Sequence, residues 1–183
     1  VLDDVRLETA RLLLRPLGAE DAPALLAIFG DPEVMRYWST PPWTSPDDAL
    51  AMVRRARESA TEGTALRLGV VRRVDGALVG TCTLFDLVAS SRRAELGYAL
   101  ARSAWGQGYA REAVGALLDH GFGAMGLHRV EADVDPRNAA SARLLERLGF
   151  VREGLLRERW IVAGEVTDTA LYGLLRREWV GDG

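Results

Sequence analysis

WGQGYARE, residues 105–112, is the stretch of sequence on which the prediction of the fold depends. It separates a strand-like segment from an amphipathic one, in which apolar residues recur at helical spacing from Ala110 to Phe122. Small residues at such a turn let the backbone approach a ligand closely. The first amides of the helix lack partners within it and, with the helix dipole, favour an anion. From these residues alone, an anion site and a plain strand-to-helix turn are equally good interpretations.

Two other phosphate-binding loops are excluded or disfavoured. A Walker loop is excluded because no Gly-Lys-Ser or Gly-Lys-Thr follows, and the chain contains no lysine. A dinucleotide fingerprint needs a third Gly or Ala three residues after Gly108, where Arg111 stands. Glu131 lies about where a ribose-binding acid belongs, but three antiparallel-looking strands precede the turn in place of an initial βαβ unit.

The rest of the pattern predicts one mixed α/β domain over residues 1–183, without repeats or linkers. Residues 31–46 contain four prolines and two tryptophans, which predicts a loop. Helices are expected at 20–29, 47–62, 110–122 and 138–148. Seven strands are expected, at 11–17, 65–72, 77–86, 93–101, 128–134, 151–162 and 165–176.

The composition is that of one ordinary soluble domain, with 183 residues of which 48% are hydrophobic and 27% charged. A net charge of −3 argues against a nucleic-acid-binding protein, which usually carries a basic face. The single cysteine, Cys82, excludes an intrachain disulfide. His120 and His128 have no companion at metal-ligand spacing, so no metal is expected.

The location expected from the sequence is the cytoplasm, without a membrane partner. No apolar run is long enough to span a bilayer. Residues 1–15 interleave acids and arginines and lack the plan of a signal peptide.

The glycine turn resembles the acetyl-CoA pyrophosphate loop of the GNAT N-acetyltransferase superfamily. That loop usually reads Gln or Arg, two residues, Gly, one residue, then Gly or Ala. Gly108 and Ala110 match the small positions, whereas Trp105 stands where Gln or Arg is usual. With Glu112, the run looks like the RimJ/RimL branch, which acetylates protein N-termini, notably of ribosomal proteins. Similar motifs occur in the same order along nearly the whole chain, at 7–17, 95–98, 138–141 and 148–150.

This resemblance implies a GNAT-like fold: a mixed, largely antiparallel seven-stranded sheet, splayed near its middle, with helices on both faces. It implies acetyl-CoA as co-substrate and direct transfer to an amine within a ternary complex. A protein N-terminal α-amine is the preferred acceptor. A small-molecule amine such as a polyamine or aminoglycoside, and a non-catalytic acyl-CoA-binding domain, remain alternatives. Monomer and homodimer both remain open.

The resemblance also implies which residues contact acetyl-CoA, mainly through the backbone. Trp38 and Trp43 are expected to line the acceptor pocket, or only to pin the proline-rich loop. The cofactor-binding residues expected are Tyr98, Leu100, Ala101, Arg102, Gln107, Gly108, Tyr109, Ala110, Arg111, Asn138 and Ser141.

Glu95 is the candidate general base. Acetyl transfer requires the amine to lose a proton, and Glu95 lies in the strand just before the glycine turn, from which the superfamily often supplies a glutamate. The alternative is a strand glutamate paired with Arg93 or another arginine. Glu158 and Asp168, on the last two strands, are weaker candidates.

The carbonyl oxygen and the departing thiolate need hydrogen-bond donors. Gly97 predicts a bulge or a close approach, and the resemblance implies a bulge that presents an amide to the thioester oxygen. Asn138 suits a helix N-cap, and in the resembling branch it also contacts the cofactor. By the same resemblance Ser141 lies near the sulfur and assists the leaving thiolate. Many relatives have a tyrosine acid where this chain has Leu145. Ser141 is therefore the candidate catalytic donor, and the alternative is a serine that only begins the helix.

Overall fold

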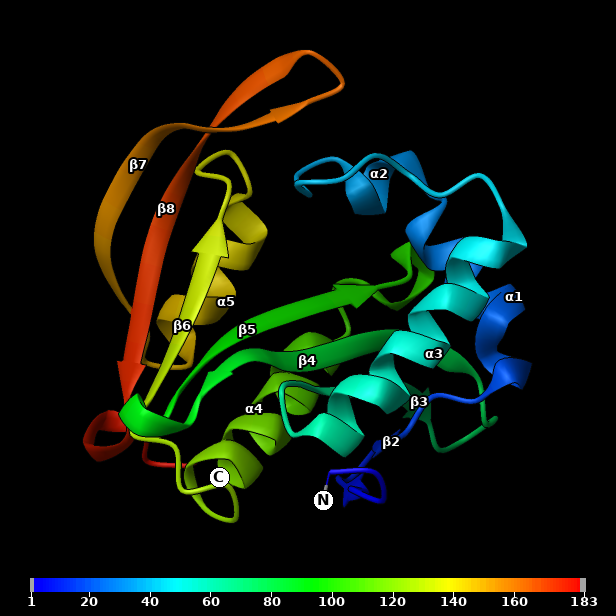
Figure 1. Cartoon of the computed structure of the whole chain (residues 1–183), viewed down its shortest axis with the longest axis horizontal. Coiled ribbons are helices and arrows are strands. Elements are labelled where there is room, and N and C mark those ends of the chain that lie inside the picture. Colours follow the sequence, from blue (N-terminus) through cyan, green and yellow to red (C-terminus); the bar gives the residue numbers. More distant parts are fainter. Residues whose placement is uncertain (1, 182–183) are drawn as a thin grey trace.

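The computed structural model describes residues 2–181 as a sheet of eight strands flanked by helices (Figure 1). The strands are β1 (Leu7–Glu8), β2 (Leu12–Arg15), β3 (Leu66–Arg72), β4 (Leu78–Val88), β5 (Arg93–Leu100), β6 (Arg129–Val134), β7 (Val151–Val162) and β8 (Glu165–Leu175). The helices are α1 (Ala22–Phe29), α2 (Pro32–Met35), α3 (Pro46–Glu62), α4 (Tyr109–Phe122) and α5 (Ala139–Arg147). The strand order is β1-β2-β3-β4-β5-β6-β8-β7.

The mixed, largely antiparallel fold is confirmed, but two local predictions were wrong. An eighth strand, β1, pairs with β2, with Leu7 opposite Leu14. Its two residues are too few to produce a periodic pattern. The predicted loop at 31–46 contains the short helix α2. The Asp31 side chain caps it by accepting the Glu33 amide, and Pro32 occupies the first turn, where its missing N–H costs nothing.

The helices divide between the two faces of the sheet (Figure 1). On one face, residues such as Leu96 and Leu100 of β5 join α4 and α5 in the larger core. On the other face, Ala99 joins a smaller core formed with α1, α2 and α3. Because successive strand residues point to opposite faces, β5 contributes to both cores.

The sheet is splayed between β5 and β6. These two are the one parallel pair among the described strands, and they are paired only from Arg93–Glu95 to Arg129–Glu131. Beyond Glu95 the strands diverge, although β5 continues to Leu100 and β6 to Val134 (Figure 1). The backbone groups of both strands along this divergence are therefore not used in pairing β5 with β6.

The bulge predicted at Gly97 is not there. The pairing of β4 with β5 runs without a shift from Gly80–Leu100 to Phe85–Glu95. The irregularity lies in β4 between Phe85 and Val88, where Asp86 has a φ of 48°. Gly97 faces a close approach instead, since a Cβ there would lie 3.3 Å from Phe85 Cε1. The glycine thus makes room for the Phe85 ring.

No helix within residues 2–181 has the length and apolar character needed to cross a membrane.

Candidate active site

A cavity of about 920 Å³ opens at the divergence of β5 and β6. Its walls come from β5, β6, the glycine turn, α5, the α2 segment and the β7–β8 hairpin. Glu95 and Tyr98 both line it, although alternation along β5 directs them to opposite faces of the sheet. The cavity is therefore accessible to groups that arrive from either face.

One end of the cavity has the features that favour an anion. Gly108 is the N-cap of α4 and has a φ of 80°, a left-handed backbone conformation that residues other than glycine rarely adopt. The Glu112 amide makes the first helical bond, to the Gly108 carbonyl. The amides of Tyr109 and Ala110 precede it and have no acceptor within the helix. Together with the helix dipole, they favour a phosphate-like group at this end.

Residues from the start of the chain hold the glycine turn in place. Glu112 accepts hydrogen bonds from Thr9 Oγ1 at 2.6 Å and from Arg11 Nε at 2.7 Å. Arg11 Nη1 donates in turn to the Gln107 carbonyl at 2.8 Å, and its guanidinium lies 4.7 Å from the centre of the Tyr109 ring. Thr9, Arg11 and Glu112 thus form one interaction network that fixes the glycine turn.

The start of α5 brings two hydroxyl groups into the same cavity. Asn138 caps the helix, because its Oδ1 accepts the Ser141 amide at 3.1 Å. Ser141 Oγ lies 2.5 Å from the Tyr98 hydroxyl. The N-cap interpretation of Asn138 is confirmed, and both Asn138 and Ser141 line the cavity.

Glu95 lies at the cavity with an elevated pKa. Burial raises the pKa of its carboxyl group to about 7, assisted by repulsion from Asp133, Asp86 and Glu131 and opposed by Arg159. Within residues 2–181 its side chain has no hydrogen bond and no ion pair. A carboxyl group of this kind changes protonation state near neutral pH, as a general base requires.

Arg93 does not pair with Glu95. Its Nη1 lies 2.5 Å from Glu131 Oε2, and Arg129 binds both Glu131 and Glu153. The alternative interpretation, in which Arg93 pairs with Glu95, is therefore wrong. The physical reason is the parallel register of β5 and β6, which places a second glutamate beside Glu95.

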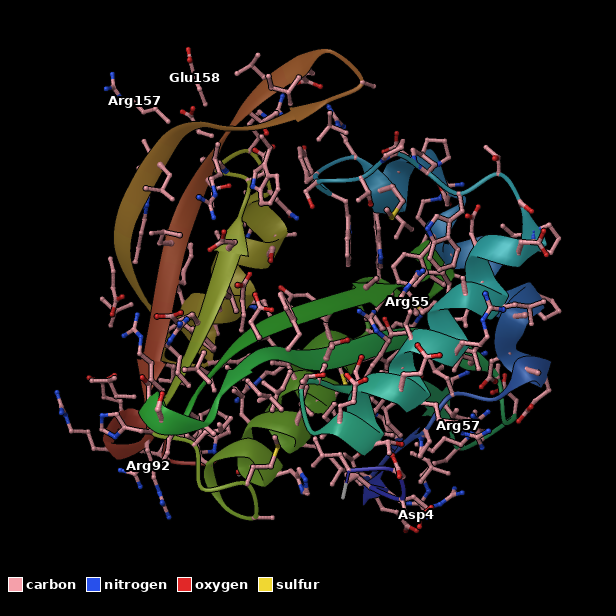
Figure 2. All side chains as sticks on the ribbon, in the orientation of Figure 1. Asp4, Arg55, Arg57, Arg92, Arg157 and Glu158 are labelled. Carbon is pink, nitrogen blue, oxygen red and sulfur yellow. The ribbon has the colours of Figure 1, made fainter. Side chains whose placement is uncertain are left out.

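The weaker candidates for the base differ in position. Asp168 lines the cavity, but its Oδ1 accepts the Glu158 amide at 2.8 Å. Glu158 has a φ of 53°, and its side chain points away from the sheet (Figure 2). Glu95 is thus better placed than either.

Some, but not all, of the residues predicted to bind substrate or cofactor line the cavity. Trp38 lines it, whereas Trp43 does not and stacks on Phe29 with ring centres 4.6 Å apart, where it supports the α2 segment. Arg102 forms an ion pair with Asp31 outside the cavity wall, and Ala101 and Gln107 also lie outside it. The predicted cofactor contacts that do line the cavity are Tyr98, Leu100, Gly108, Tyr109, Ala110, Arg111, Asn138 and Ser141.

Sequence reasoning missed Asp133, Tyr37 and Trp160 as cavity residues. The alternation of residues 128–134 contains a signal for Asp133, since it shares a face with Glu131. That signal becomes useful only once β6 is known to lie beside β5. The described part of the chain contains no cluster of three His, Cys, Asp or Glu side chains that suits a metal ion.

Comparison with known proteins identifies the family of this chain. Residues 11–151 match the family model "Acetyltransferase (GNAT) domain". An uncharacterized N-acetyltransferase, p20 of Bacillus licheniformis, is 39% identical over 96% of this chain and 98% of its own. The [ribosomal protein uS5]-alanine N-acetyltransferase of Escherichia coli is 27% identical over 96% of this chain and 93% of its own.

A solved structure supports the same conclusion. The spermidine N-acetyltransferase of Vibrio cholerae, in complex with CoA and spermine, is 25% identical with a TM-score of 0.83, covering 94% of this chain and all of that one. The family match covers most of the chain, and the p20 relative is similar over nearly the full length of both proteins. The chain belongs to the GNAT acetyltransferase family and is an acetyl-CoA-dependent N-acetyltransferase.

Proposed function

We propose that this enzyme acetylates the α-amine of a protein or peptide N-terminus by direct attack on acetyl-CoA. The observation that carries the proposal is Glu95, which lines the cavity, forms no ion pair with any described residue and has a pKa raised to about 7. An N-terminal α-ammonium has a pKa of about 7.7–8.0, against about 10.4 for a lysine side chain. The pKa of a base near 7 is close to that of the α-ammonium and far below that of the lysine ammonium.

The two reactants are proposed to enter from opposite faces of the sheet. Acetyl-CoA fits between α4 and α5, with its pyrophosphate on the amides that follow Gly108 and its thioester beside Ser141. The amine fits on the other face, beside Glu95, Asp133 and Trp38. Tyr98 contacts Ser141, beside which the thioester is placed. The distance from Glu95 to Tyr98 along β5 is roughly 10 Å, from the rise of about 3.3 Å per strand residue. Because the attacking amine must lie close to the thioester, we infer that Glu95 reaches it through a bridging water.

The reaction follows from these positions. Glu95 takes a proton from the bound ammonium, and the neutral nitrogen attacks the thioester carbon. A C–N bond forms, and the C–S bond breaks with its electron pair on sulfur. The nitrogen loses a second proton, which balances the one that the CoA thiolate takes up. Ser141 stabilises the departing sulfur through a hydrogen bond.

A small polyamine is the second candidate acceptor. Asp133, Asp168 and Glu33 also line the cavity, and such an acidic wall attracts a molecule with several positive charges. The Vibrio cholerae relative is named a spermidine acetyltransferase. The match between the pKa values of Glu95 and an α-amine favours the N-terminal acceptor.

An acceptor panel read out by CoA release separates these candidates. We expect short peptides with free N-termini to exceed N-terminally blocked lysine peptides in kcat/KM at pH 7, because far more of the α-amine is neutral at that pH. If spermidine or an aminoglycoside exceeds every peptide by about tenfold, a difference of about 1.4 kcal/mol, the N-terminal assignment is wrong.

Ser141→Ala is expected to lower kcat without weakening acetyl-CoA binding. The hydroxyl acts as sulfur departs, so its loss affects the transition state more than the bound ground state. We expect a loss of about three- to thirtyfold in kcat, or about 0.7–2 kcal/mol, because the charge on sulfur is only partly developed and the hydrogen bond is intermediate between a neutral and a charged one. Steady-state kinetics measure kcat, and calorimetry measures the affinity. A variant with wild-type kcat would leave Ser141 as a helix-start residue only.

A further inference from the structure

Tyr98 and Ser141 form a hydroxyl pair inside the cavity. The 2.5 Å distance joins Tyr98 Oη on β5 to Ser141 Oγ in the first turn of α5, 43 residues apart in sequence. The Ser141 amide is held separately by Asn138 Oδ1. Both the main chain and the side chain of Ser141 are therefore fixed by identified partners. No other hydrogen bond to either hydroxyl group occurs among the described residues.

The direction of this hydrogen bond matters, because a serine hydroxyl carries one hydrogen. If Ser141 donates to Tyr98, it has no hydrogen left for a departing sulfur. If Tyr98 donates, the Ser141 hydrogen is free. A phenol is the stronger acid of the two groups and so the better donor. Burial raises the pKa of Tyr98 to about 12, so the phenol keeps its proton at neutral pH.

We propose that Tyr98 is a positioning residue, which donates to Ser141 Oγ and thereby directs the Ser141 hydrogen toward the sulfur of acetyl-CoA. This inference rests on the proposed role of Ser141. Tyr98 itself transfers no proton. As the C–S bond breaks, its electron pair moves to sulfur and is stabilised by the Ser141 hydrogen. The thiolate is then protonated in the step already balanced by the proton that nitrogen loses.

The test is a double-mutant cycle on kcat with Tyr98→Phe, Ser141→Ala and the double variant. Tyr98→Phe keeps the ring in the core and removes only the hydroxyl. We expect it to lower kcat about three- to thirtyfold, with acetyl-CoA affinity unchanged by calorimetry. In the Ser141→Ala background the same change is expected to cost less than about twofold, because Tyr98 acts through Ser141.

Tyr172→Phe is the matched control. Tyr172 is a buried tyrosine of β8 in the same core, and it does not line the cavity. It is expected to leave kcat unchanged, and its melting temperature shows how much stability is lost when a core tyrosine outside the cavity loses its hydroxyl group.

Three outcomes are distinguishable. If the kcat losses of the two single variants multiply in the double variant, Tyr98 acts independently of Ser141 and the inference is overturned. If Ser141→Ala is slow but Tyr98→Phe is as fast as the parent enzyme, the inference is again wrong, while the role of Ser141 stands. If Ser141→Ala itself retains full kcat, both the role of Ser141 and the positioning role of Tyr98 are wrong.

Discussion

Glu95→Gln is expected to lower kcat by about 10²–10⁴ at pH 7, the range for loss of a general base. The substitution keeps the size and polarity of the side chain, so acetyl-CoA affinity should be unchanged. The folded-state pKa of Glu95 is raised to about 7. The free energy of unfolding therefore decreases as the pH rises from the unfolded-state pKa of this carboxyl group through 7, because ionisation is less favourable in the folded protein. The neutral glutamine removes that cost, so the melting temperature at pH 8 should be no lower than in the parent enzyme.

The pH profile distinguishes a base from a structural residue. With saturating peptide, kcat of the parent enzyme should rise with pH through about 7, as the Glu95 carboxyl ionises. This rise is the rising limb of the pH profile, and the glutamine variant should lack it. Its defect should shrink as pH approaches the pKa of the α-amine, because solution then supplies neutral amine. Activity within about threefold of the parent at pH 7, far short of the general-base range, would remove Glu95 from the mechanism.

Glu131→Gln is the matched control for this experiment. Glu131 is paired with Arg93 and Arg129 and is not assigned to the chemistry, so kcat should stay within about threefold of the parent, well outside the general-base range. Its charge is one of those that raise the pKa of Glu95. Its removal should therefore move the rising limb to lower pH. An unmoved limb would mean that the limb does not report on Glu95.

Gly108→Val is expected to weaken acetyl-CoA binding at least about a hundredfold, because two or more charge-assisted hydrogen bonds from the turn are lost. Gly108 has a φ of 80°, and a β-branched residue resists that conformation. A Cβ at this position would also lie 3.2 Å from Arg11 Nη2, which belongs to the network that fixes the turn. Calorimetry with acetyl-CoA measures the effect.

Gly76→Val separates backbone strain from lost binding. Gly76 also has a positive φ, of 70°, but lies in the hairpin between β3 and β4 with nothing within 4 Å of an added Cβ. This variant should lose comparable stability and keep its affinity for acetyl-CoA. Wild-type affinity in a folded Gly108→Val protein would contradict the assignment of residues 105–112 as the pyrophosphate turn.

Most elements of the fold are predictable from the sequence because they depend on interactions between near neighbours. The apolar spacing from 110 to 122 predicts α4, and the Asn138 cap needs only an amide three residues away. The hairpins follow from the turns at Val74-Asp75-Gly76 and Ala163-Gly164. The elements that escaped, β1 and α2, have two and four residues, too few for periodicity to be visible.

The candidate site divides in the same way. The sequence by itself determined where the glycine turn lies, and its resemblance to the GNAT superfamily pointed to Glu95 and Ser141 as candidate catalytic residues. Only the tertiary structure decided that Arg93 binds Glu131, so that Glu95 forms no ion pair within residues 2–181, and that Trp43 stacks on Phe29. It also decided that Tyr98 meets Ser141. The physical reason is that pKa values and hydroxyl pairing depend on groups tens of residues apart in sequence, which the parallel register of β5 with β6 and the packing of α5 bring together.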